Sequence, residues 1–322
     1  MRTITLEEHY ATPAFMEGPG RQLKAQALAM VGDDVLDQLC DLGDGRIAGM
    51  DAAGIDVQVL SLNTPGVEQL DAADARPLAR ATNDHLAEVV RRHPERLAGF
   101  AALPTPAPDD AADELERTVR DHGFKGAMIN GHSRGRYLDD EFFWPILERA
   151  QALRVPLYLH PTTPPTPVIE AAYAGNYPAE VAGTLATVAW GWHIDTATHV
   201  LRLVASGAFD RYPGLQVVVG HMGEALPFML PRIASTLSRV AKLERPVEAY
   251  FLENLHYTFA AFNWTPTFLN LLLQVGVERI MFAADHPYGS MRRAREFLEH
   301  LPVSGADRER IAHGNAERLL RL

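Results

Sequence analysis

The sequence contains a single cysteine, Cys40, among 322 residues. One cysteine excludes a disulfide within the chain and most metal sites built from thiolates; by default we expect Cys40 to be a small buried residue. No apolar run approaches the roughly 18–20 residues of a membrane-spanning helix. The first residues, MRTITLEEHY, carry two glutamates where a signal peptide would be apolar. We therefore expect a cytoplasmic protein that does not interact with membranes.

Basic residues are also scarce. The 30 Lys and Arg against 41 Asp and Glu give a formal net charge of −11. Such a chain repels phosphate backbones, which argues against nucleic-acid binding. With 47% hydrophobic and 22% charged residues, the composition is that of an ordinary globular protein. The 13 histidines are the unusual feature.

Short apolar runs alternate with longer amphipathic segments along the whole chain. Several runs are apolar on both faces, which is typical of parallel strands covered by helices. A strand followed by a helix, repeated eight times, predicts a (β/α)₈ TIM barrel formed by residues 1–322 as one domain. The expected strands are 3–8, 55–62, 98–103, 124–130, 156–160, 215–220, 254–259 and 279–284. The expected helices are 74–93, 109–122, 141–153, 196–208, 223–243, 265–275 and 291–301.

Two segments, 10–40 after the first strand and 161–195 after the fifth, are too long to be simple connections. The second begins HPTTPPTP, and its prolines disfavour regular structure. In a barrel, both segments lie over the C-terminal mouth, where active sites are found.

Residues that can bind a metal or carry a proton cluster at the expected strand ends. Glu7 and His9 stand two apart on one strand, so their side chains share a face. Together with His160 and Asp285 they form a nitrogen and oxygen set that suits one divalent ion, Zn²⁺ or Mn²⁺. Glu8 points the other way and is expected at a solvated strand end. Taken alone, Glu7 can also be solvated and Asp285 can be a capping residue.

His221 ends the sixth expected strand, and Glu224 follows three residues later at the start of a helix. Glu224 can accept a hydrogen bond from the His221 ring and fix its tautomer, which favours a catalytic dyad. The alternatives are a core histidine bonded to the backbone and a glutamate that only benefits from the helix dipole.

Other polar and aromatic residues have open roles. His132 follows the fourth strand and is a candidate for substrate contact. His256 either lines the barrel or is simply buried. His193, Trp190 and Trp192 lie in the 161–195 segment, where the tryptophans either cover an aromatic substrate or pack in the core.

Four motifs at the strand ends resemble those of the amidohydrolase superfamily: LEEH at 6–9, YLHP at 158–161, GHMGE at 220–224 and ADHP at 284–287. Much of the superfamily begins with His-x-His. Glu7-x-His9 instead resembles the metal-dependent, non-oxidative decarboxylases such as those of γ-resorcylate and 2,3-dihydroxybenzoate. The resemblance runs nearly end to end and includes SLNTP at 61–65, AALP at 101–104 and MING at 128–131.

The resemblance implies roles for individual residues. Glu7, His9, His160 and Asp285 would bind the metal, and His221 supported by Glu224 would be the catalytic histidine. Asn130 and Arg232 match positions that contact the aromatic acid. Arg232 lies eleven residues past His221, and its alternative is a surface arginine of a helix. His286 stands where relatives commonly carry Trp or Tyr beside the substrate ring, a departure that concerns the substrate rather than the metal.

We expect decarboxylation of a small ortho-hydroxybenzoate-type acid, with Asp285 donating a proton to the ring carbon that bears the carboxylate. The alternative is a hydrolase or hydratase of an ester, lactone, amide or unsaturated acid, in which the ion activates water. By likeness to this branch the protein is expected to be a homodimer or homotetramer, with the apolar segment 261–274 at an interface.

Overall fold

The structure, a computed structural model, describes residues 1–21 and 33–322. Its strands are parallel and form two groups, β1-β2-β3 and β4 to β9 in chain order. Phe100 alone separates β3 (Leu97–Gly99) from β4 (Ala101–Ala102), so the two form one barrel strand paired with β2 on one side and β5 on the other. The N–H of Leu6 in β1 donates to the carbonyl of Phe282, just after β9, over 3.2 Å. The strands thereby close into the predicted (β/α)₈ barrel.

Each expected strand overlaps an observed strand whose residues are all buried, as expected for parallel strands covered by helices. Besides β3 and β4, the strands are β1 (Ile4–Tyr10), β2 (Val57–Leu62), β5 (Ala127–Asn130), β6 (Leu157–His160), β7 (Val217–Val219), β8 (Leu255–Thr258) and β9 (Ile280–Met281).

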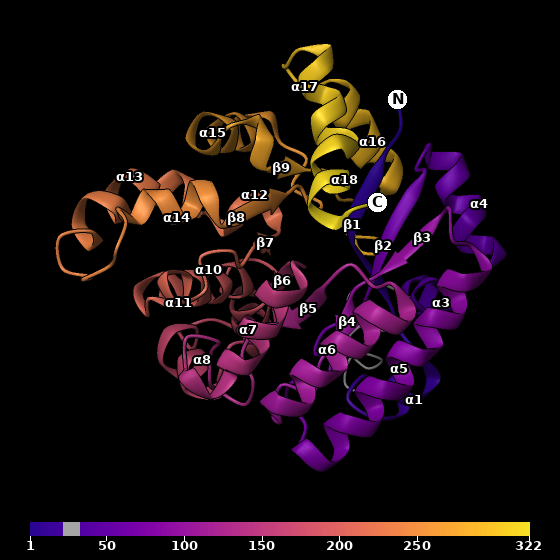
Figure 1. Cartoon of the computed structure of the whole chain (residues 1–322), viewed down its shortest axis with the longest axis horizontal. Helices are drawn as coiled ribbons and strands as arrows, with labels where there is room; N and C mark the ends of the chain where they lie inside the picture. Colours follow the sequence, from indigo (N-terminus) through magenta and orange to yellow (C-terminus); the bar gives the residue numbers. More distant parts are fainter. Residues whose placement is uncertain (22–32) are drawn as a thin grey trace.

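Helices surround the strands (Figure 1). α6 shows why they form where the sequence predicts. It begins with Pro108 and two aspartates in its first turn and ends at Gly123, whose φ of 71° suits glycine. The helices that cover the barrel are α4 (Asp44–Ala53), α5 (Ala72–Arg92), α6 (Pro108–His122), α7 (Trp144–Leu153), α10 (Gly191–Ala205), α13 (Leu226–Leu237), α15 (Thr265–Val275) and α16 (Met291–Glu299).

Shorter helices fill the connections. α1 (Pro13–Glu17) and α3 (Asp33–Cys40) belong to the first long segment, whose residues 22–32 lie outside the described residues. α8 (Thr166–Ala172) and α9 (Ala179–Ala186) belong to the second. The others are η1 (Glu141–Phe143), α11 (Ala208–Arg211), α12 (His221–Glu224), α14 (Val247–Glu253), η2 (Val277–Arg279), α17 (Gly305–Glu309), η3 (Arg310–Gly314) and α18 (Asn315–Leu320).

Two local predictions are wrong. The helix expected over 223–243 is only α13, because residues from Met222 to Ala225 adopt left-handed backbone angles that interrupt a right-handed helix. Cys40 is exposed at the end of α3 rather than buried.

The interior of the barrel holds its own apolar cluster, to which most strands contribute. It includes Leu6, Val59, Met128 and Val218, and Leu320 of α18 packs against it. Asn315 of α18 donates to the carbonyl of Ile280, the first residue of β9, so this helix lies at the amino-terminal end of the strands. The opposite, carboxyl end is left for the site.

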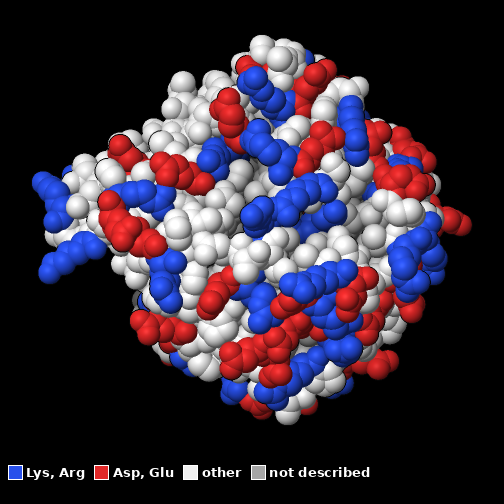
Figure 2. Space-filling model, in the orientation of Figure 1, with Lys and Arg blue, Asp and Glu red and all other residues white. Residues whose placement is uncertain are grey.

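Within residues 1–21 and 33–322, no helix combines the length and apolar character that crossing a membrane requires. Figure 2 shows one face of the molecule, where basic and acidic side chains alternate over much of the surface.

Candidate metal centre and active site

Glu7 lies at an irregularity near the end of β1. The pairing of β1 with β2 shifts between Leu6 and Glu8, and Glu7 has a φ of 71°. A bulge of this kind re-aims a side chain next to a site. A side chain at Gly220, directly after β7, would begin 2.5 Å from Glu7 Oε2 and would displace the carboxylate.

The two oxygens of Glu7 have different surroundings. Oε2 accepts hydrogen bonds from the hydroxyl groups of Tyr158 and, over 3.3 Å, of Thr258. Among the described residues Oε1 has no hydrogen-bond donor, and it lies 3.4 Å from His160 Nε2. Burial raises the pKa of Glu7 to about 8, although the charge of His221 and the hydrogen bond from Tyr158 oppose this. Because Oε1 has no donor among the described residues, it is the Glu7 oxygen that can bind a cation.

The predicted metal ligands converge. One ligand atom each from Glu7, His9, His160 and Asp285 lies within 4.8 Å of the other three. His9 Nε2 is 3.2 Å from Asp285 Oδ1, and the rings of His9 and His160 are 4.7 Å apart.

The cluster fits one divalent ion. Burial, followed by the charges of His9 and His221, lowers the pKa of His160 well below its ordinary value, so its ring is neutral and offers a lone pair. Within the described part of the chain, Glu7 Oε1 and both ring nitrogens of His9 are buried without a hydrogen-bond partner. Buried polar atoms are normally satisfied, and a bound cation would satisfy Glu7 Oε1 and one of the two nitrogens of His9. Nitrogen and carboxylate donors suit zinc or manganese.

Glu8 is not a solvated strand end, and that prediction is wrong. Its side chain is 0% exposed, and its two oxygens accept the N–H groups of Ala284 over 2.9 Å and His286 over 3.2 Å. Burial raises the pKa of Glu8 to about 8, while these two hydrogen bonds and the nearby Arg46 oppose the rise. Glu8 therefore joins β1 to the peptide groups on both sides of Asp285.

Asp285 follows β9 with a φ of 60°. Its carbonyl accepts the N–H of Gly289 over 2.6 Å, and the N–H of His9 donates to the carbonyl of His286 over 2.7 Å. A left-handed residue other than glycine costs on the order of 1–3 kcal/mol and persists only where its surroundings hold it. Here the contacts from β1 and Gly289 hold the turn that carries the Asp285 carboxylate.

His221 and Glu224 form the predicted pair. His221 Nδ1 lies 2.8 Å from Glu224 Oε1, and His221 Nε2 lies 3.7 Å from Glu7 Oε1. Burial disfavours a charged His221, but the carboxylates of Glu224 and Glu7 outweigh it and raise its pKa to about 10. At neutral pH this raised pKa favours the positively charged form of the His221 ring, which faces the metal cluster.

The three predicted substrate contacts are placed differently. Asn130 is buried beside the cluster, because β5 pairs it with His160, and Glu68 Oε1 accepts its N–H over 2.8 Å. Arg232 is exposed on α13.

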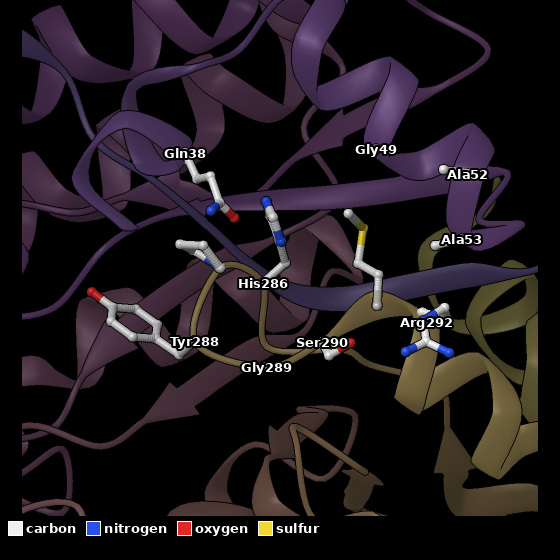
Figure 3. A pocket seen from close by; sticks show the side chains of 11 residues that line it. Gln38, Gly49, Ala52, Ala53, His286, Tyr288, Gly289, Ser290 and Arg292 are labelled. Carbon is white, nitrogen blue, oxygen red and sulfur yellow. The ribbon is translucent and has the colours of Figure 1, made fainter. Parts of the chain in front are cut away.

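His286 lines a cleft of about 450 Å³ between α3, α4 and the segment that follows β9. Its ring points toward the side chain of Gln38, while Tyr288 extends away from it (Figure 3). Burial, followed by the charges of Arg46 and His9, lowers the pKa of His286 to about 3, so the ring is neutral. The residues that line this cleft include none of the four predicted ligands.

The other open histidines are mostly structural. His256 is buried, and its Nε2 lies 3.0 Å from Gln216 Oε1. His132 is buried after β5, with Nε2 3.1 Å from the carbonyl of Thr163. His193 is different, because its Nδ1 lies 2.5 Å from Glu224 Oε2.

Three residues that touch the site were missed from the sequence. Tyr158 could have been predicted from the sequence, because it stands two residues before His160 on one strand and so shares its face. Glu68 lies in a turn after β2 and His193 in the first turn of α10, and nothing in the local sequence relates either residue to the site.

A closed parallel barrel whose strand ends bring two carboxylates and two imidazoles together is the architecture of a metal-dependent barrel enzyme. The family model of the amidohydrolases matches residues 24–322. The γ-resorcylate decarboxylase of Polaromonas sp. is 38% identical over 99% of this chain and 98% of its own.

Solved structures agree with this similarity. A dihydroxybenzoic acid decarboxylase of Polaromonas sp., with bound manganese and the inhibitor 2-nitroresorcinol, superimposes with a TM-score of 0.90 at 36% identity, covering 100% of this chain and 97% of that one. The 5-carboxyvanillate decarboxylase of Novosphingobium aromaticivorans, with manganese and 4-hydroxy-3-methoxy-5-nitrobenzoic acid, gives 0.91 at 33% identity, covering 100% and 96%. The chain belongs to the amidohydrolase family, in its branch of metal-dependent non-oxidative decarboxylases, which confirms the resemblance of the motifs.

Proposed function

We propose that the protein is a divalent-metal-dependent decarboxylase of a small ortho-hydroxybenzoate, with Mn²⁺ as the first candidate ion and Zn²⁺ as the second. The observation that carries the proposal is the convergence of Glu7, His9, His160 and Asp285 within 4.8 Å at the carboxyl end of the barrel. The full-length similarity to γ-resorcylate and dihydroxybenzoate decarboxylases supports the substrate class.

The bound ion would supply Lewis-acid chemistry, lowering the pKa of a phenol and holding the negative charge of the substrate. Asp285, carrying a proton, donates it to the ring carbon that bears the carboxylate. The bond from this carbon to the carboxylate then breaks, CO₂ leaves, and the electron pair of that bond restores the aromatic ring.

His221 has the role of a charged hydrogen-bond donor. Its raised pKa keeps it protonated, and Glu224 fixes its orientation. A protonated imidazole beside the cluster attracts a carboxylate substrate, which the net charge of −11 would otherwise repel.

Asn130 is proposed to contact or shape the aromatic ring. His286 is proposed to do so from the resemblance alone, because its ring lines the cleft beside Gln38. Arg232 is proposed as a carboxylate contact from the resemblance alone, because its side chain is exposed on α13.

We also propose that the protein forms a homodimer or homotetramer through α13 and α15. Phe228 of α13 is 74% exposed, Leu273 of α15 is 83% exposed, and Trp264 before α15 is 59% exposed. Figure 2 shows the region of α15 as largely uncharged. A contiguous exposed apolar patch marks an interaction surface. Sedimentation of the wild type and of Leu273→Glu tests this, since a monomeric wild type would contradict it.

A substrate panel tests the activity. Protein loaded with Mn²⁺ or Zn²⁺ is incubated with 2,6-, 2,3- and 2,4-dihydroxybenzoate and salicylate, and CO₂ and the phenol are measured. 4-Hydroxybenzoate, which lacks the ortho hydroxyl, is the matched control and should not react. Simple esters, lactones, amides and unsaturated acids are incubated in parallel, and turnover of these alone would reject decarboxylation in favour of a hydrolase or hydratase.

A further inference from the structure

Glu224 is shared by two histidines. Its Oε1 lies 2.8 Å from His221 Nδ1, and its Oε2 lies 2.5 Å from His193 Nδ1. The Glu224 side chain is 0% exposed, so both of its oxygens depend on protein donors. Each oxygen has one imidazole as its partner.

His193 comes from a part of the chain that sequence reasoning did not connect with the site. It lies in the first turn of α10, at the end of the 161–195 segment, whereas His221 and Glu224 lie in α12 after β7. Its Nε2 lies 3.2 Å from the carbonyl of Val188. Both partners are acceptors, and the contact of Nδ1 with the Glu224 carboxylate is the shorter of the two, so Nδ1 is the donor that the structure directs toward the site.

The three rings around this carboxylate also pack together. The centroids of His193 and His221 are 4.8 Å apart, and Phe262 lies 5.2 Å from the first and 5.4 Å from the second. The orientation of His193 is therefore set by packing as well as by its two hydrogen bonds.

The turn that carries the pair needs support. His221, Met222, Glu224 and Ala225 all have φ between 47° and 64°, a conformation that residues other than glycine adopt only where neighbours hold it. Burial opposes the charge of Glu224, but the charge of His221 and the hydrogen bond from His193 lower its pKa below the ordinary value. The carboxylate remains an acceptor for both rings.

We infer that His193 is a positioning residue of the active site, which holds the second oxygen of Glu224 and through it fixes the ring of His221. The inference rests on the proposed function, because it assigns His221 to the reaction. His193 itself does not reach the metal cluster; its role is exercised through Glu224.

Three substitutions separate the contacts of His193. In His193→Asn the amide nitrogen lies where Nδ1 lies, so the hydrogen bond to Glu224 is kept and the one to Val188 is lost. In His193→Gln the amide nitrogen lies where Nε2 lies, so the hydrogen bond to Val188 is kept and the one to Glu224 is lost. His193→Phe keeps the ring packing and removes both hydrogen bonds.

We expect His193→Asn to keep kcat within about threefold of the wild type. Loss of a supporting hydrogen bond typically lowers activity 10–100-fold, and we expect a fall of that order in kcat for His193→Gln and His193→Phe, with KM and Mn²⁺ affinity little changed. Thermal unfolding shows whether each variant is folded. The inference would be overturned if His193→Gln had the kcat of the wild type. It would also be overturned if the kcat of His193→Asn fell as far as that of His193→Gln.

A second measurement does not depend on turnover. In zinc-loaded protein with ¹⁵N-labelled histidine, the ring nitrogen signals of His221 should be unchanged in His193→Asn and shifted in His193→Gln. An unshifted His221 signal in His193→Gln would contradict the inference even if activity fell. If the wild type decarboxylates nothing in the panel, the proposed function fails, and these spectra still decide the role of His193.

Discussion

Glu8 holds Asp285 by the peptide groups on either side of it. The N–H groups of Ala284 and His286 donate to the two oxygens of the Glu8 carboxylate, and Asp285 between them has a φ of 60°. The proposed metal ligand that follows the last strand is thus positioned by a residue adjacent to two proposed ligands on the first strand, Glu7 and His9.

Glu8→Gln should weaken metal binding although Glu8 is not a proposed ligand. An amide has one acceptor oxygen, so one of the two N–H groups loses its partner and meets an NH₂ group instead. An unsatisfied buried group costs about 1–3 kcal/mol of stability, and a supporting residue typically changes metal affinity 10–100-fold. Mn²⁺ titration and thermal unfolding measure both effects.

Glu88→Gln is the control for this experiment, because Glu88 is exposed on α5. It should match the wild type in metal affinity and unfolding temperature. If Glu8→Gln also bound Mn²⁺ as the wild type does, Glu8 would have no role in placing Asp285.

Tyr158→Phe should lower metal affinity by a similar factor. The Tyr158 hydroxyl donates to Glu7 Oε2 and orients the carboxylate so that Oε1 faces His160. Tyr257→Phe is a matched control on the next-but-one barrel strand, since its hydroxyl is equally buried and donates to the carbonyl of Phe251 over 3.1 Å. Both variants lose a buried hydrogen bond, so equal Mn²⁺ affinities would contradict this role for Tyr158.

The stabilisation that Mn²⁺ provides should grow as pH rises toward 8. Burial raises the pKa of Glu7 to about 8 in the folded, metal-free protein, above its ordinary value near 4.5. Between these values the folded state binds more protons than the unfolded state, so the stability of the metal-free protein falls as pH rises. Metal binding requires the ionised carboxylate and therefore competes with the proton.

Unfolding temperatures of metal-free and Mn²⁺-loaded protein from pH 6 to 8.5 measure this effect. The difference between the two temperatures should widen with pH. A constant or narrowing difference would show that Glu7 does not exchange a proton for the metal.

The barrel and the convergence of the four proposed ligands were predictable because both depend on local patterns. Buried strands are apolar runs, and proposed ligands such as His160 and Asp285 stand at or shortly after the ends of those runs. Glu8 was misjudged because strict alternation along β1 points it away from the mouth, whereas the bulge at Glu7 and the adjacent end of β9 enclose it. The partnership of His193 with Glu224 depends on how a long segment folds back over the barrel, which no local pattern encodes.

Asp285→Asn should lower kcat by at least about 10³-fold at saturating Mn²⁺, within the range that loss of a general acid produces. The amide can still present an oxygen to the ion, but it has no acidic proton to give to the ring carbon. Asparagine readily adopts left-handed angles, so the φ of 60° at this position should persist and the fold should be unchanged. Metal content, circular dichroism and single-turnover rates at saturating Mn²⁺ separate a lost ligand from a lost proton donor. If the metal-loaded variant decarboxylates at the wild-type rate, the ring proton comes from another group, and His221 becomes the next candidate because its protonated ring faces the same cluster.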